Sequence, residues 1–152
     1  MSNKKLLIKM ILGIAMIFAT RFFVGASLMF IEVNGSSMEP TLKDGQNGVA
    51  FTLNLEKLER GDIIVLVKDG GYIVKRVIGL PGETVRCKNN QIYINGLPIE
   101  DEFAELTDGF REITLGYDEI FVLGDNRIKS FDSRHYGPFK LSQVVAKKAF
   151  FF

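Results

Sequence analysis

The sequence has only one cysteine and one histidine in 152 residues. Cys87 alone cannot form an internal disulfide, which argues against a small secreted scaffold held together by disulfides. Cys87 lies in the hairpin-like stretch ETVRCKNNQIYING with no histidine nearby, so packing within a strand is its expected role. Downstream of the N-terminal segment there is also no repeat of fixed period and no long helical pattern, so a helical body is not expected.

A basic surplus is absent from most of the chain. Four of the 19 basic residues and none of the 18 acidic residues lie in residues 1–31. Although the whole chain has a net charge of +1, residues 32–152 therefore carry a slight acidic excess. No stripe of interleaved basic and aromatic residues occurs. These features exclude nucleic acid as an expected partner.

The sequence does contain an apolar N-terminal segment. Residues 6–23 are interrupted only by Lys9 and Arg21, and as a helix they would extend about 27 Å, close to the thickness of a hydrocarbon core. The charge near each end could reach the nearer interface. Lysines dominate the leading end, which favours a cytoplasmic N-terminus. We therefore predict one transmembrane helix within a membrane anchor over residues 1–27, and an extracytoplasmic domain over residues 28–152.

Two alternatives to the anchor remain open. A cleavable signal peptide would use residues 10–20 as its apolar core and the small residues at 24–26 as its cleavage site. An interfacial helix would hold Lys9 and Arg21 among the lipid headgroups. All three interpretations bring the chain to a lipid bilayer.

The body of the chain shows the pattern of short strands. Segments rich in Val, Ile, Phe, Tyr and Thr are separated by Asp-Gly-Gly, Leu-Pro-Gly, Asn-Asn and Asn-Gly turns. The expected strands cover residues 47–53, 62–68, 72–80, 83–88, 92–94, 111–115 and 119–124. The acidic segment 97–110 reads as a surface excursion, and residues 141–152 as a last strand or a short helix. We predict a mainly β fold of antiparallel sheets.

Three segments could carry chemistry. In VNGSSMEPTL (33–42) a serine at a turn could act as a nucleophile, although Asn-Gly-Ser-Ser is also ordinary turn chemistry. In YIVKRVIGL (72–80), strand alternation places Lys75 between Ile73 and Val77 on one face. Desolvation there would lower the pKa of its amine, and a neutral lysine can take a proton from a serine hydroxyl. The alternative interpretation is that Lys75 is simply an exposed lysine on an edge strand.

The third segment is LGDNRIKSFDSRHYGPF (123–139), in which a Gly-Asp-Asn turn leaves a strand and charged residues follow. By itself it reads as a solvated loop with local ion pairs. An alternative interpretation is a Ser37–His135–Asp catalytic triad. Its place beside a turn makes a surface or packing role the expected one.

Taken in order after an apolar N-terminal span, the motifs Ser-Met-x-Pro-Thr, Lys-Arg-Val-Ile-Gly-Leu-Pro-Gly-Glu and Gly-Asp-Asn-Arg-x-x-Ser-x-Asp-Ser-Arg resemble those of the type I signal peptidases. The resemblance extends to about residue 139 and is closest to the short, Gram-positive-type members. It implies that Ser37 is the nucleophile and Lys75 the general base. It further implies an active serine endopeptidase that needs no metal or cofactor and cuts exported preproteins after Ala-x-Ala.

The resemblance also assigns supporting residues. Arg76 would pair with Asp125, Ser130 would hydrogen-bond the lysine, and Asp132 would pair with Arg134. The residues matching the wall of the small-residue pocket are Val33, Met38, Leu42, Ile73 and Val74. Gly35 occupies a position where many members carry a Ser or Thr that donates to the oxyanion. Either that donor is missing, or the backbone requires glycine there.

The expected partners are preprotein signal peptides and the bilayer, with secretion or pilus-assembly components as further candidates. A non-catalytic, signal-peptidase-like assembly factor is the alternative function, for instance in building surface pili. Such a protein would not need both Ser37 and Lys75. A self-cleaving repressor with a related Ser/Lys fold would carry an N-terminal DNA-binding region, and nothing in this sequence resembles one.

Overall fold

The computed structural model describes residues 7–17, 28–52, 57–103, 107 and 109–152. Residues 7–17 form a helix rich in Leu, Ile and Met, and each of its large apolar side chains is more than half exposed. Over the described residues, no helix combines the length and apolar character needed to cross a bilayer. The ends of the predicted span, the Arg21 charge and the alternative cleavage site at 24–26 lie outside the described residues.

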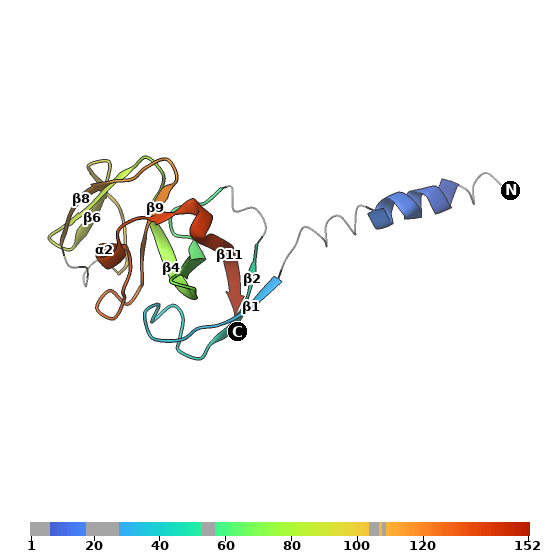
Figure 1. Ribbon diagram of the computed structural model, residues 1–152, viewed down its shortest axis with the longest axis horizontal. Helices are drawn as coiled ribbons and strands as arrows, with labels where there is room; N and C mark the ends of the chain where they lie inside the picture. Colours follow the sequence, from blue (N-terminus) through green and yellow to red (C-terminus); the bar gives the residue numbers. More distant parts are fainter. Residues whose placement is uncertain (1–6, 18–27, 53–56, 104–106, 108) are drawn as a thin grey trace.

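The body consists of two antiparallel sheets (Figure 1). The seven-stranded sheet has the order β1-β2-β11-β3-β4-β9-β10 and the four-stranded sheet the order β7-β6-β5-β8. The strands of the large sheet are β1 (Leu28–Glu32), β2 (Asn47–Phe51), β3 (Ile63–Lys68), β4 (Gly71–Gly79), β9 (Glu119–Leu123), β10 (Phe139–Lys140) and β11 (Val144–Phe151). Those of the small sheet are β5 (Thr84–Lys88), β6 (Gln91–Ile94), β7 (Leu97–Pro98) and β8 (Phe110–Thr114). The short helices are α2 (Ser133–Tyr136) and the 3-10 turn η2 (Leu141–Gln143).

Each predicted strand is confirmed within a residue or two, because β-branched and aromatic residues fit a half-buried pleated surface. The expected Asp-Gly-Gly turn forms a hairpin that joins β3 to β4 through Asp69 and Gly70, whose φ angles are +51° and +78°. Two positive φ angles in a two-residue loop match the right-handed twist of the strands. The C-terminal segment proves to be strand β11, preceded by the turn η2.

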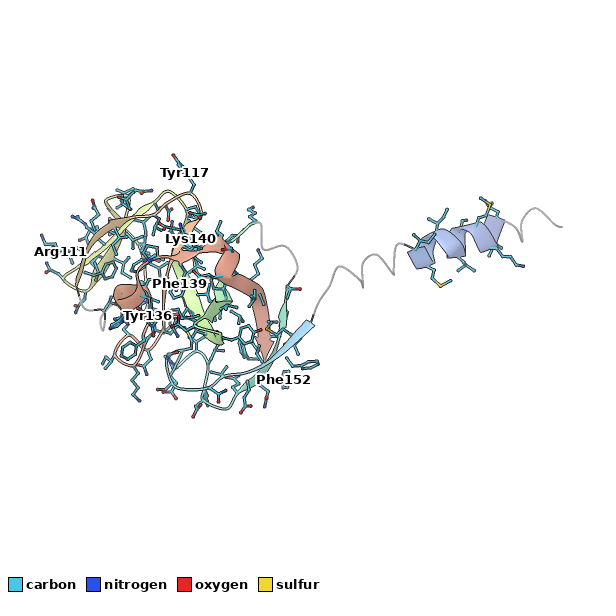
Figure 2. All side chains as sticks on the ribbon, in the orientation of Figure 1. Arg111, Tyr117, Tyr136, Phe139, Lys140 and Phe152 are labelled. Atoms are coloured by element: carbon cyan, nitrogen blue, oxygen red, sulfur yellow. The ribbon has the colours of Figure 1, made fainter. Side chains whose placement is uncertain are left out.

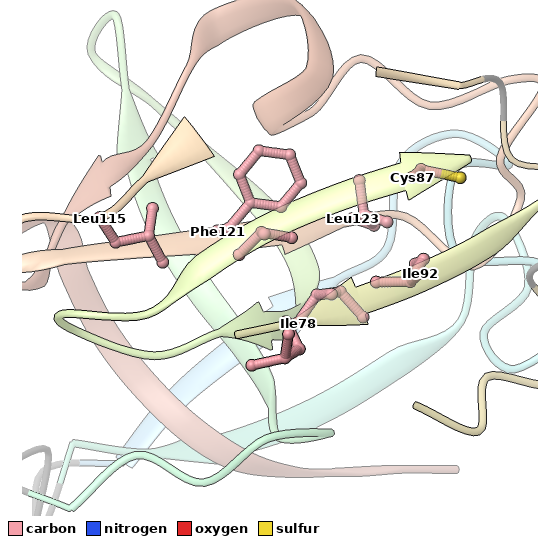
Figure 3. Close-up of a cluster of buried hydrophobic side chains, with 8 residues drawn as sticks. Ile78, Cys87, Ile92, Leu115, Phe121 and Leu123 are labelled. Atoms are coloured by element: carbon pink, nitrogen blue, oxygen red, sulfur yellow. The ribbon is translucent and has the colours of Figure 1, made fainter. Parts of the chain in front are cut away.

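The two sheets pack through one apolar cluster, in which Ile78 and Phe121 of the large sheet meet Val85 and Ile92 of the small sheet (Figure 3). Cys87 belongs to this cluster and is 4% exposed, so its predicted packing role is confirmed. A second cluster fills the other face of β4 and β9 with Val77 and its neighbours. Aromatic side chains at turns stay in solvent, as Tyr117 does at the edge of the body (Figure 2).

Candidate active site

The nucleophile candidate lies in a tight loop between β1 and β2. Val33, Met38 and Leu42 are buried and pack together against Val74, which holds the loop on the body. The Leu42 N–H donates to the Met38 carbonyl at 2.9 Å. The apolar residues of VNGSSMEPTL therefore fix the backbone that carries Ser37.

Lys75 meets Ser37 at the predicted place. Its Nζ lies 2.9 Å from the Ser37 Oγ and also donates to the Val74 carbonyl at 2.9 Å. The side chain is 4% exposed, so the reading of an exposed edge lysine is wrong. Burial lowers the pKa of Lys75 from 10.5, although the charges of Asp132 and Asp125 act in the opposite direction. Desolvation prevails, and the amine is prepared to accept a proton.

The Gly-Asp-Asn turn after β9 holds both sides of the site. The Asn126 N–H donates to the Ser37 carbonyl at 3.1 Å. Arg76, next to the candidate base, donates twice to Asp125, at 2.8 and 2.6 Å. The turn thus connects the serine loop to the lysine strand, and the two residues expected to pair do lie together.

Asp132 anchors the segment after this turn. Its carboxylate accepts from the Gly124 N–H at 3.0 Å and from Arg134 at 2.9 Å, and it caps α2 through the Arg134 N–H. Burial acts to raise the pKa of Asp132, but the hydrogen bonds from Arg134 and Gly124 outweigh it, and the pKa falls below its ordinary value. The expected pair of Asp132 and Arg134 is present.

Ser130 differs from expectation. Its hydroxyl is buried and makes no hydrogen bond of good geometry with any described residue, so the expected bond to Lys75 is not formed. The hydroxyl lies close enough to Asp132 to contribute to the lowered pKa of that carboxylate. The Lys75 amine donates to Ser37 and to its own neighbouring carbonyl instead.

A groove of about 500 Å³ contains the dyad. Of the five predicted wall residues, Val33, Met38, Ile73 and Val74 line it. Leu42 does not line the groove and packs behind Val33 and Met38. A second cavity, of about 310 Å³, is lined by Arg76 and the 99–103 segment and includes neither member of the dyad, so it is not the reaction site.

Arg127 is a buried cation whose role the sequence did not reveal. Its Nε donates to the Gly124 carbonyl at 3.0 Å, and its other nitrogens bind Asp101, at 3.0 Å, and the Thr107 hydroxyl. The prediction that 97–110 is a surface excursion is therefore wrong for Asp101 and Thr107. Arg127 holds these two residues against the Gly-Asp-Asn turn. The position of Arg127 directly after Gly-Asp-Asn places it beside the turn but gives no sign that its side chain is buried.

Gly35 adopts a φ of +91°, which supports the backbone explanation for glycine at this position. Its N–H donates to the Asp44 carboxylate at 2.7 Å. A Cβ added at this residue would have no heavy atom within 4 Å, so the constraint is conformational and not steric. Any other residue would strain the loop that carries Ser37.

We expect Gly35→Ala and Gly35→Ser both to reduce kcat/KM by about tenfold, because a non-glycine residue at this φ costs about 1–2 kcal/mol. Initial rates on a synthetic signal-peptide substrate, together with the melting temperature of each variant, test this. Improved cleavage by Gly35→Ser beside impaired cleavage by Gly35→Ala would show that the site lacks a donor.

Cleavage should rise with pH as Lys75 loses its proton, since only the neutral amine can act as a base. Because burial lowers the pKa of Lys75, the midpoint of this limb should lie below 10.5. The measurement is kcat/KM against pH with a substrate that lacks titrating groups. A midpoint at or above the value of a solvated lysine would contradict the burial of the base.

A serine hydroxyl beside a buried lysine amine, on a scaffold of antiparallel strands, is the arrangement that a hydrolase of the Ser/Lys type requires. The family model for signal peptidase, peptidase S26, matches residues 4–152. Signal peptidase I S of Bacillus subtilis is 40% identical over 136 residues, which cover 79% of this chain and 74% of the relative. Signal peptidase IB of Staphylococcus aureus is 33% identical over 174 residues and covers 98% of this chain and 91% of the relative.

A solved structure agrees with these relatives. The crystal structure of a signal peptidase I from Enterococcus faecalis V583 has a TM-score of 0.56 and 32% identity, covering 60% of this chain and 97% of the other. The chain belongs to the signal peptidase family, peptidase S26. It is a serine endopeptidase of the type I signal peptidase class, which removes signal peptides.

Proposed function

We propose that this enzyme is anchored in the cell membrane and cuts exported preproteins after small residues, with Ser37 as nucleophile and Lys75 as general base. The observation that carries these roles is the 2.9 Å separation of the Lys75 Nζ and the Ser37 Oγ in a buried setting. It supports a direct transfer of the serine proton to the amine.

The reaction proceeds in two halves. Neutral Lys75 takes the Ser37 proton as the Oγ attacks the scissile carbonyl, and the resulting ammonium then protonates the leaving amine of the mature protein. Water, deprotonated by the same amine, next attacks the acyl-enzyme, and the ammonium returns that proton to the leaving Ser37 Oγ as the signal peptide is released. The backbone N–H of Ser37 is the proposed donor to the oxyanion, with the loop held in place by Gly35.

The substrate would bind as an extended strand. β1 is an edge strand of the large sheet, and β4 pairs with β9 only from Arg76 onward, which leaves residues 72–75 with one open edge among the described strands. Both segments line the groove. A peptide between them could pair with two open edges, as in strand addition. The apolar wall of Val33, Met38 and Val74 beside Ser37 favours a small side chain before the cut.

The full chain in detergent, incubated with a preprotein carrying Ala-x-Ala, tests this function. We expect one cut directly after the second alanine, loss of the cut when that alanine becomes Phe, and no cut by Ser37→Ala. A preprotein left intact by the folded wild-type enzyme would favour the non-catalytic assembly role instead.

The membrane anchor at residues 1–27, and with it the extracytoplasmic domain at 28–152, is also a proposal. The helix over residues 7–17 supports it, because its apolar side chains face outward on all sides and need a lipid or protein environment. Protease added to intact protoplasts should digest the body and spare the N-terminal stub. A protected body would reverse the orientation, and a mature form that starts after residue 26 would favour a cleaved signal peptide.

A further inference from the structure

Glu32 is the acidic side chain of the groove. Among the described residues that line it, Glu32 and Lys75 alone carry carboxyl or amino groups. Lys75 is buried and works as the neutral base, whereas Glu32 is exposed at the end of edge strand β1, one residue before Val33. No basic side chain of the described residues forms an ion pair with Glu32. Its negative charge is therefore available to a bound peptide.

The alternation along β1 shows which face Glu32 occupies. Ile31 and Met29 pack against the apolar cluster of Ala50 and Val65, while Phe30, between them, is 80% exposed. Glu32 points outward as Phe30 does, because successive side chains of a strand point to opposite faces. Val33 returns to the buried face, where it packs with Met38.

A peptide strand laid beside β1 has the same two faces, whether it runs parallel or antiparallel. The two alanines of Ala-x-Ala are two residues apart, so they share one face and the x residue takes the other. Only the buried face, with Val33 and Met38 beside Ser37, restricts size. The alanines must therefore point to that face, and the x side chain points to the outer face with Glu32.

The position of the cut brings the x residue close to Glu32. The residue before the cut lies at Ser37 and Val33, and the x residue is one step of about 3.3 Å farther along the groove. Glu32 is likewise one step from Val33. The two side chains are thus direct or diagonal neighbours across the strands, a distance that Lys or Arg side chains span.

We infer that Glu32 determines a charge preference at the middle residue of Ala-x-Ala, favouring Lys or Arg and disfavouring Asp or Glu. The inference rests on the proposed function and adds to it a feature of substrate selection. Opposite charges on neighbouring strands attract and like charges repel. Because the pair is exposed, we expect a preference of about fivefold between Lys and Glu, weakening with added salt.

The test compares three otherwise identical substrate peptides, with Ala-Lys-Ala, Ala-Gln-Ala and Ala-Glu-Ala before the cut, cleaved by the full chain in detergent. The ratio of kcat/KM for the Lys peptide to that for the Glu peptide should be about five in the wild type. It should approach one in Glu32→Gln and invert in Glu32→Lys. Glu112→Lys, an equal change of charge on β8 outside the groove, is the matched control and should keep the wild-type ratio.

The outcomes separate the inference from the proposed function. If the wild type fails to cut the Gln peptide, the proposed function fails. If it cuts all three peptides with a ratio near one, or if Glu32→Lys keeps the wild-type ratio, the assignment of Glu32 is overturned while the proposed function stands. A ratio that inverts equally in Glu112→Lys would assign the effect to net charge and would also overturn the inference.

Discussion

Ser37→Ala and Lys75→Ala should each abolish preprotein cleavage, with kcat lowered by about 10⁴-fold or more. In the proposed mechanism the serine forms the acyl bond, and the lysine is the only base within hydrogen-bond distance of it among the described residues. Members of such a pair act as one unit, so removing either costs nearly as much as removing both. Single-turnover cleavage of a labelled preprotein by each single variant and by the double variant measures this.

Two nearby residues serve as controls. Ser36→Ala removes the neighbouring hydroxyl, and His135→Ala removes the single histidine. His135 is exposed on α2, where its ring contacts the tilted ring of Phe131 at 4.8 Å between centroids. A triad would require it to hydrogen-bond Ser37, and the hydrogen bond of the Ser37 Oγ comes from Lys75 instead. Both variants should keep most of the activity. A loss in His135→Ala as deep as that in Lys75→Ala would overturn the assignment of the base.

Gly124→Ala should lower kcat/KM by about 100-fold or more and lower the melting temperature. A Cβ at residue 124 would overlap the Ser37 carbonyl oxygen and the Ser130 Oγ. The carbonyl is backbone and cannot rotate away, so the loop of Ser37 must shift. Displacing a reacting group by about 1 Å can cost about 100-fold in rate. Kinetics and thermal unfolding of the variant measure the two effects.

Gly71→Ala is the matched control for this substitution. Gly71 also lies in the large sheet, but the nearest heavy atom to a Cβ there is the Lys68 carbonyl at an ordinary 3.6 Å. This variant should remain close to wild type in both measurements. A Gly124→Ala enzyme with normal kinetics would mean that the contact between the turn and the serine loop is not needed for catalysis.

The strands and hairpins of this fold could be predicted because their signals are local. Asp69-Gly70 and Asn95-Gly96 both adopt positive φ angles in two-residue loops, as their sequences indicate. Strand β1 was missed, since Leu28–Glu32 continues the apolar run of the N-terminal segment and hydrophobicity alone does not separate the two. Local patterns therefore define most of the sheet but not its first edge.

The parts of the site in which the chemistry requires a particular residue type could be predicted from the sequence. The contacts between segments that are distant in the sequence could not. A lysine among Ile73 and Val77 signalled desolvation, which the low exposure of Lys75 confirms. In contrast, the buried contacts of Arg127 with Asp101 and Thr107 join residues 20 or more positions apart. A charged side chain in a loop segment normally indicates solvent, so nothing local distinguished this arginine from an exposed one.

The order of strands in the large sheet has a consequence for biosynthesis. β2, which follows the serine loop, and β3, which pairs with the lysine strand β4, are not hydrogen-bonded to each other, because β11 lies between them. The strand that joins the two halves of the sheet is thus the last in sequence (Figure 1). During synthesis, Ser37 and Lys75 are both present on the nascent polypeptide before the strand that joins their two parts of the sheet. The large sheet is therefore complete only when residues 144–151 are available, so we expect the assembled site to form after the last strand has been synthesised.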